Sequence, residues 1–276
     1  CETPVINSIP YVNKPEEITA GIPTYYASTF YDGTDYASVV VKTREGRPIF
    51  IKGNEKHGIN QGTVNARINS SVLGLYDSSR LNGPKVAGNK STWADVDSAV
   101  ASELKGVAES GKSIVMMTGT VISPSTSAAI KEFQTAYGVD AVKHISYDPI
   151  SQYGIREAHN LSYGKAMIPD YDFSKAKVIV SVAADFMNDW LLHTQYVKQY
   201  AKNRDPKSDW MSKHFQFEGT LSLTGSNADM RVPVLPSQYG NVIMALHNEV
   251  AKLTSGSQIS VNTDGLPMAQ ISEAAK

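Results

Sequence analysis

The sequence predicts an α/β protein with a doubly wound, mostly parallel sheet that carries helices on both faces, preceded by an extended arm and a small β-hairpin region. Two observations predict this fold class. From residue 91 onward, short apolar runs alternate with segments of helical periodicity, which is the pattern of βαβ units. The strand-like runs, above all AKVIVSVAADF at 176–186, are almost wholly apolar, as in strands buried on both faces of a parallel sheet.

The first ninety residues do not follow this alternation. Residues 1–35 are rich in Pro, Tyr and Thr and show neither a helical nor a strand period, so we expect an extended arm that lies on another surface. In residues 36–90, two β-branched runs flank the turn TREG, which predicts a hairpin. The stretch NARINSSVLGLY that follows predicts a short helix.

Residues 91–253 are expected to form one Rossmann-like domain, and residues 254–276 a linker with the start of a further segment. Thr92 and Asp95 resemble a capping box at the first helix. In order, the pattern predicts a helix at 91–111, a strand at 113–119, a helix at 123–138, a strand at 140–146, a helix at 151–164, a strand at 176–186, helices around 187–203 and 206–214, strands at 219–226 and 230–236, and a helix at 237–253.

Composition excludes several classes of function. The 26 basic and 27 acidic residues leave no basic excess for nucleic acid. No apolar run approaches the roughly 18 residues of a membrane-spanning helix, so membrane attachment would need a lipid or a partner. The single cysteine excludes an internal disulfide framework, a CxxC zinc site and a self-contained cysteine-ligated iron–sulfur cluster. We therefore expect no metal in this chain.

That cysteine is the first residue, and no initiator methionine precedes it. One interpretation is an arbitrary boundary. The sharper interpretation is a lipoprotein cut before Cys1, which then carries the acyl chains. Two or three chains would make residence at a membrane stable, because a single chain binds only reversibly.

Motifs for catalysis are mostly missing, since the sequence has no GxGxxG, GxxxxGK[ST], HExxH or GxSxG. The loop after Gly119 could hold an anion or simply cap a helix. Asp185 and Asp189 lie where a predicted parallel strand ends, the position at which such sheets bind ligands, and serve either as structural caps or as catalytic carboxylates. Six histidines lack metal-ligand spacing: His57, His144, His159, His193, His214 and His247.

The stretch EGRPIFIKGNEKHGINQGTVNARINSSVLGLYDSSRL resembles the opening of the molybdopterin oxidoreductase family. The matching features are Gly46-Arg47-Pro48, Gly53-Asn54, Gly62 and Tyr76-Asp77 with Arg80. Later segments, STWADVDSAV and YDFSKAKVIVSVAADFMNDWL, are similar to segments of the same family. The resemblance implies a molybdopterin-oxidoreductase-like fold.

Two cofactor signatures of that family are degenerate here. Asn65 stands where the resemblance expects a cluster-binding cysteine, and an iron–sulfur cluster needs thiolates. The segment LTGSNADMRVPVLPSQYG resembles the stretch that ends in Pro-Gly-Thr-Asp and touches the cofactor nucleotide, but Ser237, Gln238 and Tyr239 replace Gly-Thr-Asp. We therefore expect this pocket, near Gly119, Asp185 and Gly225, to be filled or closed.

The phrases IPYVNKPEEITAGIPTYYAST, LYDSSRLNGP and HFQFEGTLSLTGSNADMRVP resemble one subfamily across essentially the whole chain. It is the large iron–sulfur subunit (B subunit) of bacterial alternative complex III, a respiratory quinol:cytochrome c oxidoreductase. The resemblance implies a scaffold part without cofactor or catalytic residues. Iron–sulfur clusters would lie in a later ferredoxin-like part of the subunit, and haems in cytochrome c subunits. It also implies membrane subunits as partners, and a lipid anchor on the periplasmic face of the inner membrane.

Two rival functions remain open on the sequence. One is an active molybdopterin- or nucleotide-dependent periplasmic oxidoreductase with a site around Gly119, Asp185 and Gly225. The other is a periplasmic binding protein with a small-molecule cleft. Metal analysis and the absorbance spectrum would separate the enzyme from the scaffold, and a thermal-shift screen would reveal a binding protein.

Overall fold

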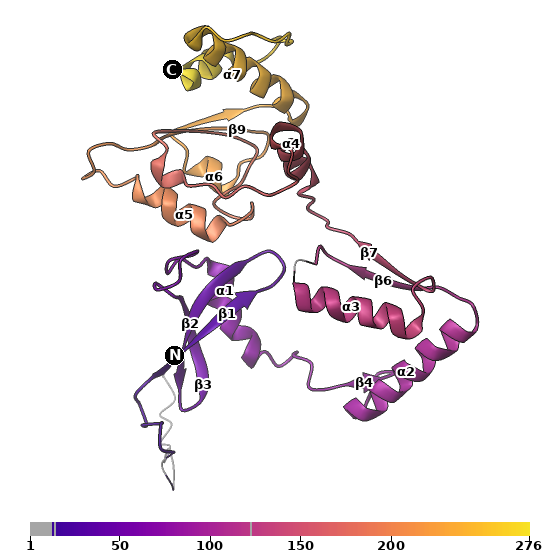
Figure 1. The fold of residues 1–276 in the computed structure, drawn as a ribbon. Helices are drawn as coiled ribbons and strands as arrows, with labels where there is room; N and C mark the ends of the chain where they lie inside the picture. Colours follow the sequence, from indigo (N-terminus) through magenta and orange to yellow (C-terminus); the bar gives the residue numbers. More distant parts are fainter. Residues whose placement is uncertain (1–12, 14, 122) are drawn as a thin grey trace. The chain divides into compact units, whose positions relative to one another are not determined.

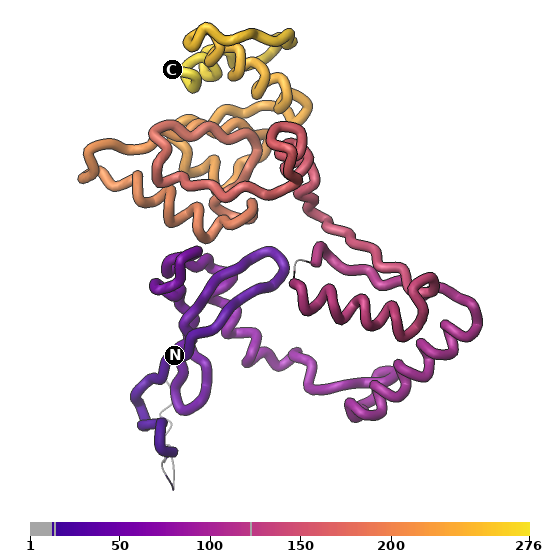
Figure 2. Tube along the Cα trace, viewed as in Figure 1, coloured from indigo at the N-terminus to yellow at the C-terminus, as the bar shows by residue number. Residues whose placement is uncertain are grey.

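The computed structural model describes residue 13 and residues 15–121 and 123–276 (Figure 1). These residues divide into two compact units: those up to Asp77 together with Tyr171–Lys276, and Ser78–Asp170. The chain leaves the first unit after Asp77 and returns to it at Tyr171 (Figure 2). The division differs from the one expected, because residues 91–253 contribute to both units. No helix among the described residues is long and apolar enough to cross a membrane.

The first unit opens with an antiparallel sheet in the order β1-β2-β3, formed by β1 (Thr24–Tyr31), β2 (Tyr36–Arg44) and β3 (Arg47–Gly53). The β2–β3 hairpin was predicted at TREG. Strand β1 was not, because residues 1–35 were expected to form an extended arm without a strand. That expectation is wrong for Thr24–Tyr31, which pairs with β2 along its whole length. Cys1 and the start of the arm lie outside the described residues.

One face of this sheet packs against the short helix α1 (Ala66–Ser70) and the 3-10 helix η1 (Ser71–Tyr76). The predicted short helix is therefore present, with a 3-10 continuation. Alternate residues of β2 point into a small core, which is formed by Ala37, Val39, Ile51, Ile68 and Val72.

The unit Ser78–Asp170 begins with a two-stranded pair, β4 (Lys85–Val86) and β5 (Asn89–Lys90), and continues as predicted. Thr92 caps α2 by accepting a hydrogen bond from the Asp95 amide and donating one to the Asp95 carboxylate. The remaining elements are α2 (Trp93–Glu109), β6 (Ile114–Thr118), α3 (Pro124–Tyr137), β7 (Val142–Ser146) and α4 (Tyr153–Tyr163), with β6 and β7 parallel.

The second half of the first unit is a parallel sheet in the order β10-β9-β8. Each of its strands pairs with the next strand along the chain. Helices lie on both faces. The elements are η2 (Phe173–Lys175), β8 (Val178–Val182), α5 (His193–Lys202), β9 (Lys213–Glu218), α6 (Leu223–Ser226), β10 (Met230–Pro233), η3 (Pro236–Gln238), α7 (Tyr239–Thr254) and α8 (Met268–Ala275).

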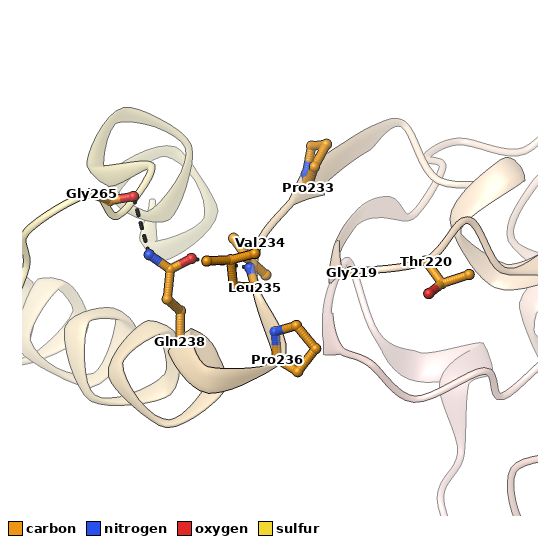
Figure 3. A pocket seen from close by; sticks show the side chains of 8 residues that line it. All are labelled: Gly219, Thr220, Pro233, Val234, Leu235, Pro236, Gln238 and Gly265. Carbon is orange, nitrogen blue, oxygen red and sulfur yellow. Dashed lines mark hydrogen bonds between the residues drawn. The ribbon is translucent and has the colours of Figure 1, made fainter.

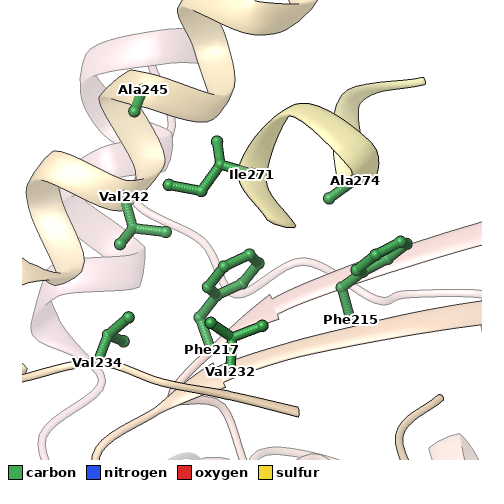
Figure 4. Packing of buried hydrophobic residues seen from close by; sticks show 8 residues of the cluster. All are labelled: Phe215, Phe217, Val232, Val234, Val242, Ala245, Ile271 and Ala274. Carbon is green, nitrogen blue, oxygen red and sulfur yellow. The ribbon is translucent and has the colours of Figure 1, made fainter. Parts of the chain in front are cut away.

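The faces of β9 differ in character. Phe215 and Phe217 point toward α7 and α8, where they pack with Val242 and Ile271 (Figure 4). The other face packs against α5 through Tyr196 and Tyr200, together with Ile179 and Phe186. Helix α8, in the residues expected to form a linker and the start of a further segment, thus completes the core of this unit.

Three predictions need correction here. The expected helix at 206–214 is absent, and β9 begins at Lys213 instead. The expected strand at 219–226 is a loop followed by the short helix α6. The parallel strands do not form one sheet, because β6 and β7 pair with each other while β8, β9 and β10 form a separate sheet.

Candidate functional site

The charged cluster at the degenerate cofactor position is centred on Asp35, whose side chain is completely buried. Arg67 on α1 donates from Nε and Nη2 to its two carboxylate oxygens at 2.7 and 2.9 Å. His193, the first residue of α5, places Nε2 2.7 Å from Oδ1 of Asp35. Arg67 also donates to the side chain and carbonyl of Asn188. The cluster therefore links the three-stranded sheet to the loop before α5.

Electrostatics favour the ionised form of Asp35. The hydrogen bonds from the Arg67 guanidinium hold the pKa of the Asp35 carboxyl below its usual range, against the opposing effect of burial. A further hydrogen bond from Asn65 and the charges of Arg67 and His193 act in the same direction. The pKa of Arg67 is raised in turn, mainly by its hydrogen bond to Asp35. The cluster is a charge-paired contact rather than a poised acid or base.

Asn65 stands within this cluster and is fully engaged. Its Oδ1 accepts a hydrogen bond from the Ile68 amide at 2.9 Å and so caps α1. Its Nδ2 lies 3.3 Å from Nε2 of His193. Nδ1 of His193 is buried without a partner among the described residues. One imidazole nitrogen and an amide do not supply the thiolates of an iron–sulfur cluster, so the residues at this position do not fit that group.

The second candidate region lies at the carboxyl ends of β8, β9 and β10, where parallel sheets bind ligands. Asp185, three residues after the end of β8, accepts hydrogen bonds from the amide and hydroxyl of Thr224 at 3.0 and 2.6 Å. The Asp185 carbonyl accepts from the amide of Asp189. Of the two roles left open by the sequence, the geometry at Asp185 is that of a structural contact that holds the start of α6.

Glu218 ends β9 and is 2% exposed. Its carboxylate accepts from the Ser222 amide and hydroxyl, from Nε of Arg231 at 2.6 Å and from Gln216. Burial opposes ionisation, but these hydrogen bonds outweigh it and leave the pKa of Glu218 below its usual range. Gly225 is needed beside it, because a Cβ there would lie 2.0 Å from Oε1 of Glu218.

The row of polar side chains continues along the same face of β9. Gln216 lies 3.3 Å from Nε2 of His214, and Nδ1 of His214 lies 3.3 Å from the hydroxyl of Tyr200. His214 and Gln216 are completely buried. Burial lowers the pKa of His214 and raises the pKa of Tyr200. The row is satisfied internally, as buried polar groups must be.

The three residues that replace Gly-Thr-Asp lie at η3 and the start of α7. Ser237 is exposed. The hydroxyl of Tyr239 accepts a hydrogen bond from the Gly219 amide, just after β9, at 2.9 Å. Gln238 accepts from the Leu235 amide and donates to the Gly265 carbonyl (Figure 3).

Gln238 also lines an open groove of about 510 Å³, which lies apart from the pocket that was expected to be filled near Gly119, Asp185 and Gly225. The remaining lining residues are Gly219, Thr220, Pro233, Val234, Leu235, Pro236 and Gly265. No charged side chain lines the groove, which leaves the phosphates of a nucleotide without a cationic partner. Asp185 and Gly225 do not line it. The groove has the size of a small-molecule site but does not fit the charge of a pterin nucleotide.

Gly119 belongs to the other unit, at the carboxyl end of β6. There the amide and hydroxyl of Thr120 donate to Asp148, which lowers the pKa of Asp148. Thr118 and His144 form a hydrogen bond at 2.8 Å. The described residues contain no group of three or more His, Cys, Asp or Glu side chains that could hold a metal ion.

Asp35, Arg67, Glu218 and Arg231 were not singled out from the sequence. Their partners are brought together by the fold, and no short motif marks them. Asn65 was singled out because it stands in place of an expected cysteine, and not because of the contacts that its side chain makes. A weak signal exists at Glu218, because His214, Gln216 and Glu218 alternate with Phe215 and Phe217 along β9.

Comparison with known proteins supports the fold at a distant level. The sequence matches no protein-family model and no curated protein. The structure is similar to acetylene hydratase from Pelobacter acetylenicus, with a TM-score of 0.58 and 11% sequence identity over 87% of this chain. The chain spans 33% of the length of that enzyme. The mixed α/β architecture, with its parallel sheets and flanking helices, thus resembles a molybdopterin-enzyme-like fold.

Proposed function

We propose that this chain is a non-catalytic scaffold domain of a membrane-bound respiratory complex that oxidises quinol and reduces cytochrome c or another electron-acceptor protein. The observation that carries the proposal is the state of Asn65. At the position where the resembling family binds a cluster, an amide caps α1 and contacts His193 beside the buried Asp35. The position therefore contributes to packing within the chain instead of holding a cluster. This is consistent with a domain that organises partners without carrying a cofactor.

The carboxyl ends of β8, β9 and β10 support the same proposal. Asp185 and Glu218 lie at this end of the sheet, and both hold α6 through hydrogen bonds. Glu218 accepts several internal hydrogen bonds and its pKa is held below the usual range, so it does not act as a general base near neutral pH. The chain would organise partners of the complex: its membrane and cytochrome c subunits and a ferredoxin-like iron–sulfur part. Cys1 would carry the lipid anchor at the periplasmic face of the inner membrane.

Purification from native membranes tests the proposal. We expect membrane and cytochrome c subunits to co-purify with this chain, and the isolated 276-residue chain to contain no stoichiometric iron or molybdenum. Intact-mass spectrometry of the native N-terminal peptide tests the anchor, since an acylated Cys1 is expected. Purification as a single subunit without cytochromes would contradict the scaffold role.

The size of the groove beside Gln238, although not its uncharged lining, favours a second candidate, a periplasmic oxidoreductase that binds a small molecule there. Its volume of about 510 Å³ lies within the range of small-molecule pockets. The distinguishing measurement is the cofactor content of the native protein after acid release. Molybdenum, tungsten or a pterin in one-to-one ratio with the chain would favour the enzyme over the scaffold.

A further inference from the structure

The solvent face of the N-terminal sheet carries a concentration of positive charge. Residues that pair across β1, β2 and β3 point to the same face, and the pairs Tyr25–Lys42, Lys42–Phe50 and Arg44–Arg47 lie on the face opposite the α1 core. Lys52 belongs to this face too, because its Nζ lies 5.7 Å from the centre of the Tyr25 ring. We define the basic sheet face as Tyr25, Lys42, Arg44, Arg47, Phe50 and Lys52.

Within the described part of the chain, no acidic residue neutralises the charges of this face. None of its four cations forms an ion pair with another described residue. The strand residues that point to this face include no Asp or Glu, and Glu45 is confined to the β2–β3 turn. With a formal net charge of −1 for the whole chain, this local excess of positive charge is a property of one surface.

Aromatic rings accompany the cations. Tyr25 is 51% exposed and Phe50 43% exposed, and they flank Lys42 on either side of β2. Exposed rings beside Lys and Arg are typical of surfaces that lie at the boundary between lipid headgroups and water. Lys and Arg can extend their charged ends to phosphates while their stems rest on the rings.

We propose that the basic sheet face binds the surface of an anionic lipid bilayer. Its cations are spread over two strands of a sheet surface and do not converge on one pocket, so they match a planar array of phosphates better than a single small anion. A protein partner is less well matched at Lys42 and Lys52, because Lys is depleted in the cores of protein interfaces. The inference needs neither the scaffold role nor the acylation of Cys1.

Vesicle binding by the full 276-residue chain tests this, with Cys1→Ser removing any acyl contribution. We expect binding to phosphatidylglycerol-containing vesicles and much weaker binding to pure phosphatidylcholine, with the difference falling as salt increases. Each cation near an anionic surface contributes about fivefold to binding. The double variant Lys42→Gln/Lys52→Gln should therefore lose about 25-fold, while its circular dichroism melt stays unchanged.

The matched control is Lys131→Gln/Lys165→Gln, which removes two exposed positive charges from the other unit. It should bind vesicles like the parent chain. Equal loss in both double variants, or equal binding to charged and neutral vesicles, would overturn the proposal. So would no vesicle binding at all, or preferential binding to polyglutamate at the same concentration of negative charge, which would assign the face to an acidic protein. If the proposed scaffold function proved wrong, the expected vesicle binding would still hold, so the two proposals can fail separately.

Discussion

Oδ1 of Asp35 lies 2.7 Å from Nε2 of His193, and this contact joins the turn before β2 to the first residue of α5. Both side chains are buried, Asp35 completely and His193 to within 2%. Beside it, the Thr194 hydroxyl donates to the Tyr36 carbonyl at 3.1 Å. Two segments far apart in the sequence are thus held together by polar side chains that are almost completely buried.

Asp35→Asn should destabilise the fold because the buried carboxylate is the shared acceptor for Arg67 and His193. Removing one partner of a buried charge pair typically costs about 3–5 kcal/mol. Since Arg67 is half-exposed and can be rehydrated, we expect about 2–3 kcal/mol. Chemical denaturation followed by tryptophan fluorescence measures the loss. Asp209→Asn, which changes an exposed carboxylate, should stay within about 0.5 kcal/mol of the parent; equal effects of both variants would contradict the prediction.

Asn65 offers a test that separates capping from the contact with His193. Asn65→Ala removes the acceptor for the Ile68 amide and should cost about 1 kcal/mol. Asn65→Ser keeps a capping oxygen but not the amide near His193, so it should recover most of that loss. Thermal unfolding of the two variants measures the difference. If serine is no better than alanine, the cap is not what Asn65 contributes.

The buried His214 makes stability depend on pH. Burial lowers its folded pKa below the usual value of 6.5, so the unfolded chain binds a proton that the folded chain excludes. Stability from this group is therefore full above about pH 6.5 and decreases as the pH falls below it, with a limiting slope of about 1.4 kcal/mol per pH unit.

His214→Gln should reduce this slope between pH 7 and 5, because glutamine does not titrate. The comparison uses denaturation midpoints at several pH values for both proteins, so that the contributions of the other histidines to the pH dependence cancel in the difference. His247→Gln is the control, since His247 lies on an exposed part of α7. Identical pH profiles of the parent and the His214 variant would show that burial of this imidazole does not govern the slope.

Local pattern predicted the apolar strands correctly and missed the polar one. Residues 176–186 were assigned as a strand from their apolar run, and β8 lies within them. Strand β9 has the sequence KHFQFE, whose His, Gln and Glu suggest solvent exposure. These side chains are buried because they hydrogen-bond to one another and to Arg231, Ser222 and Tyr200. A single sequence does not show that such distant partners exist.

The expected strand at 219–226 failed for a related reason. Its alternating Thr, Leu and Ser residues fit a strand period, but Ser222 caps α6 by accepting from the Gly225 amide. The start of α6 is held by Glu218, which accepts from Ser222, and by Asp185 in the loop after β8, which accepts from Thr224. The site at Asn65 was predicted only in part, since a missing cysteine is visible in the sequence and the buried Asp35 that fills the region is not.

The tight contact at Gly225 gives the most specific prediction of packing. A Cβ at this position would lie 2.0 Å from Oε1 and 2.6 Å from Cδ of Glu218, closer than nonbonded atoms approach. Glu218 has no room to move away, because Ser222 and Arg231 hold its carboxylate and the residue is buried. Gly225→Ala should therefore break part of this network and destabilise the fold by about 2–3 kcal/mol.

Gly240→Ala supplies the matched comparison with the opposite sign. Gly240 lies in the first turn of α7, and a Cβ there would meet nothing within 4 Å. Alanine lowers the conformational entropy of the unfolded chain, so this variant should gain up to about 1 kcal/mol. Urea midpoints of the two single variants measure the contrast. If Gly225→Ala is as stable as Gly240→Ala, then the Glu218 carboxylate does not lie against residue 225, and its proposed role in holding α6 is wrong.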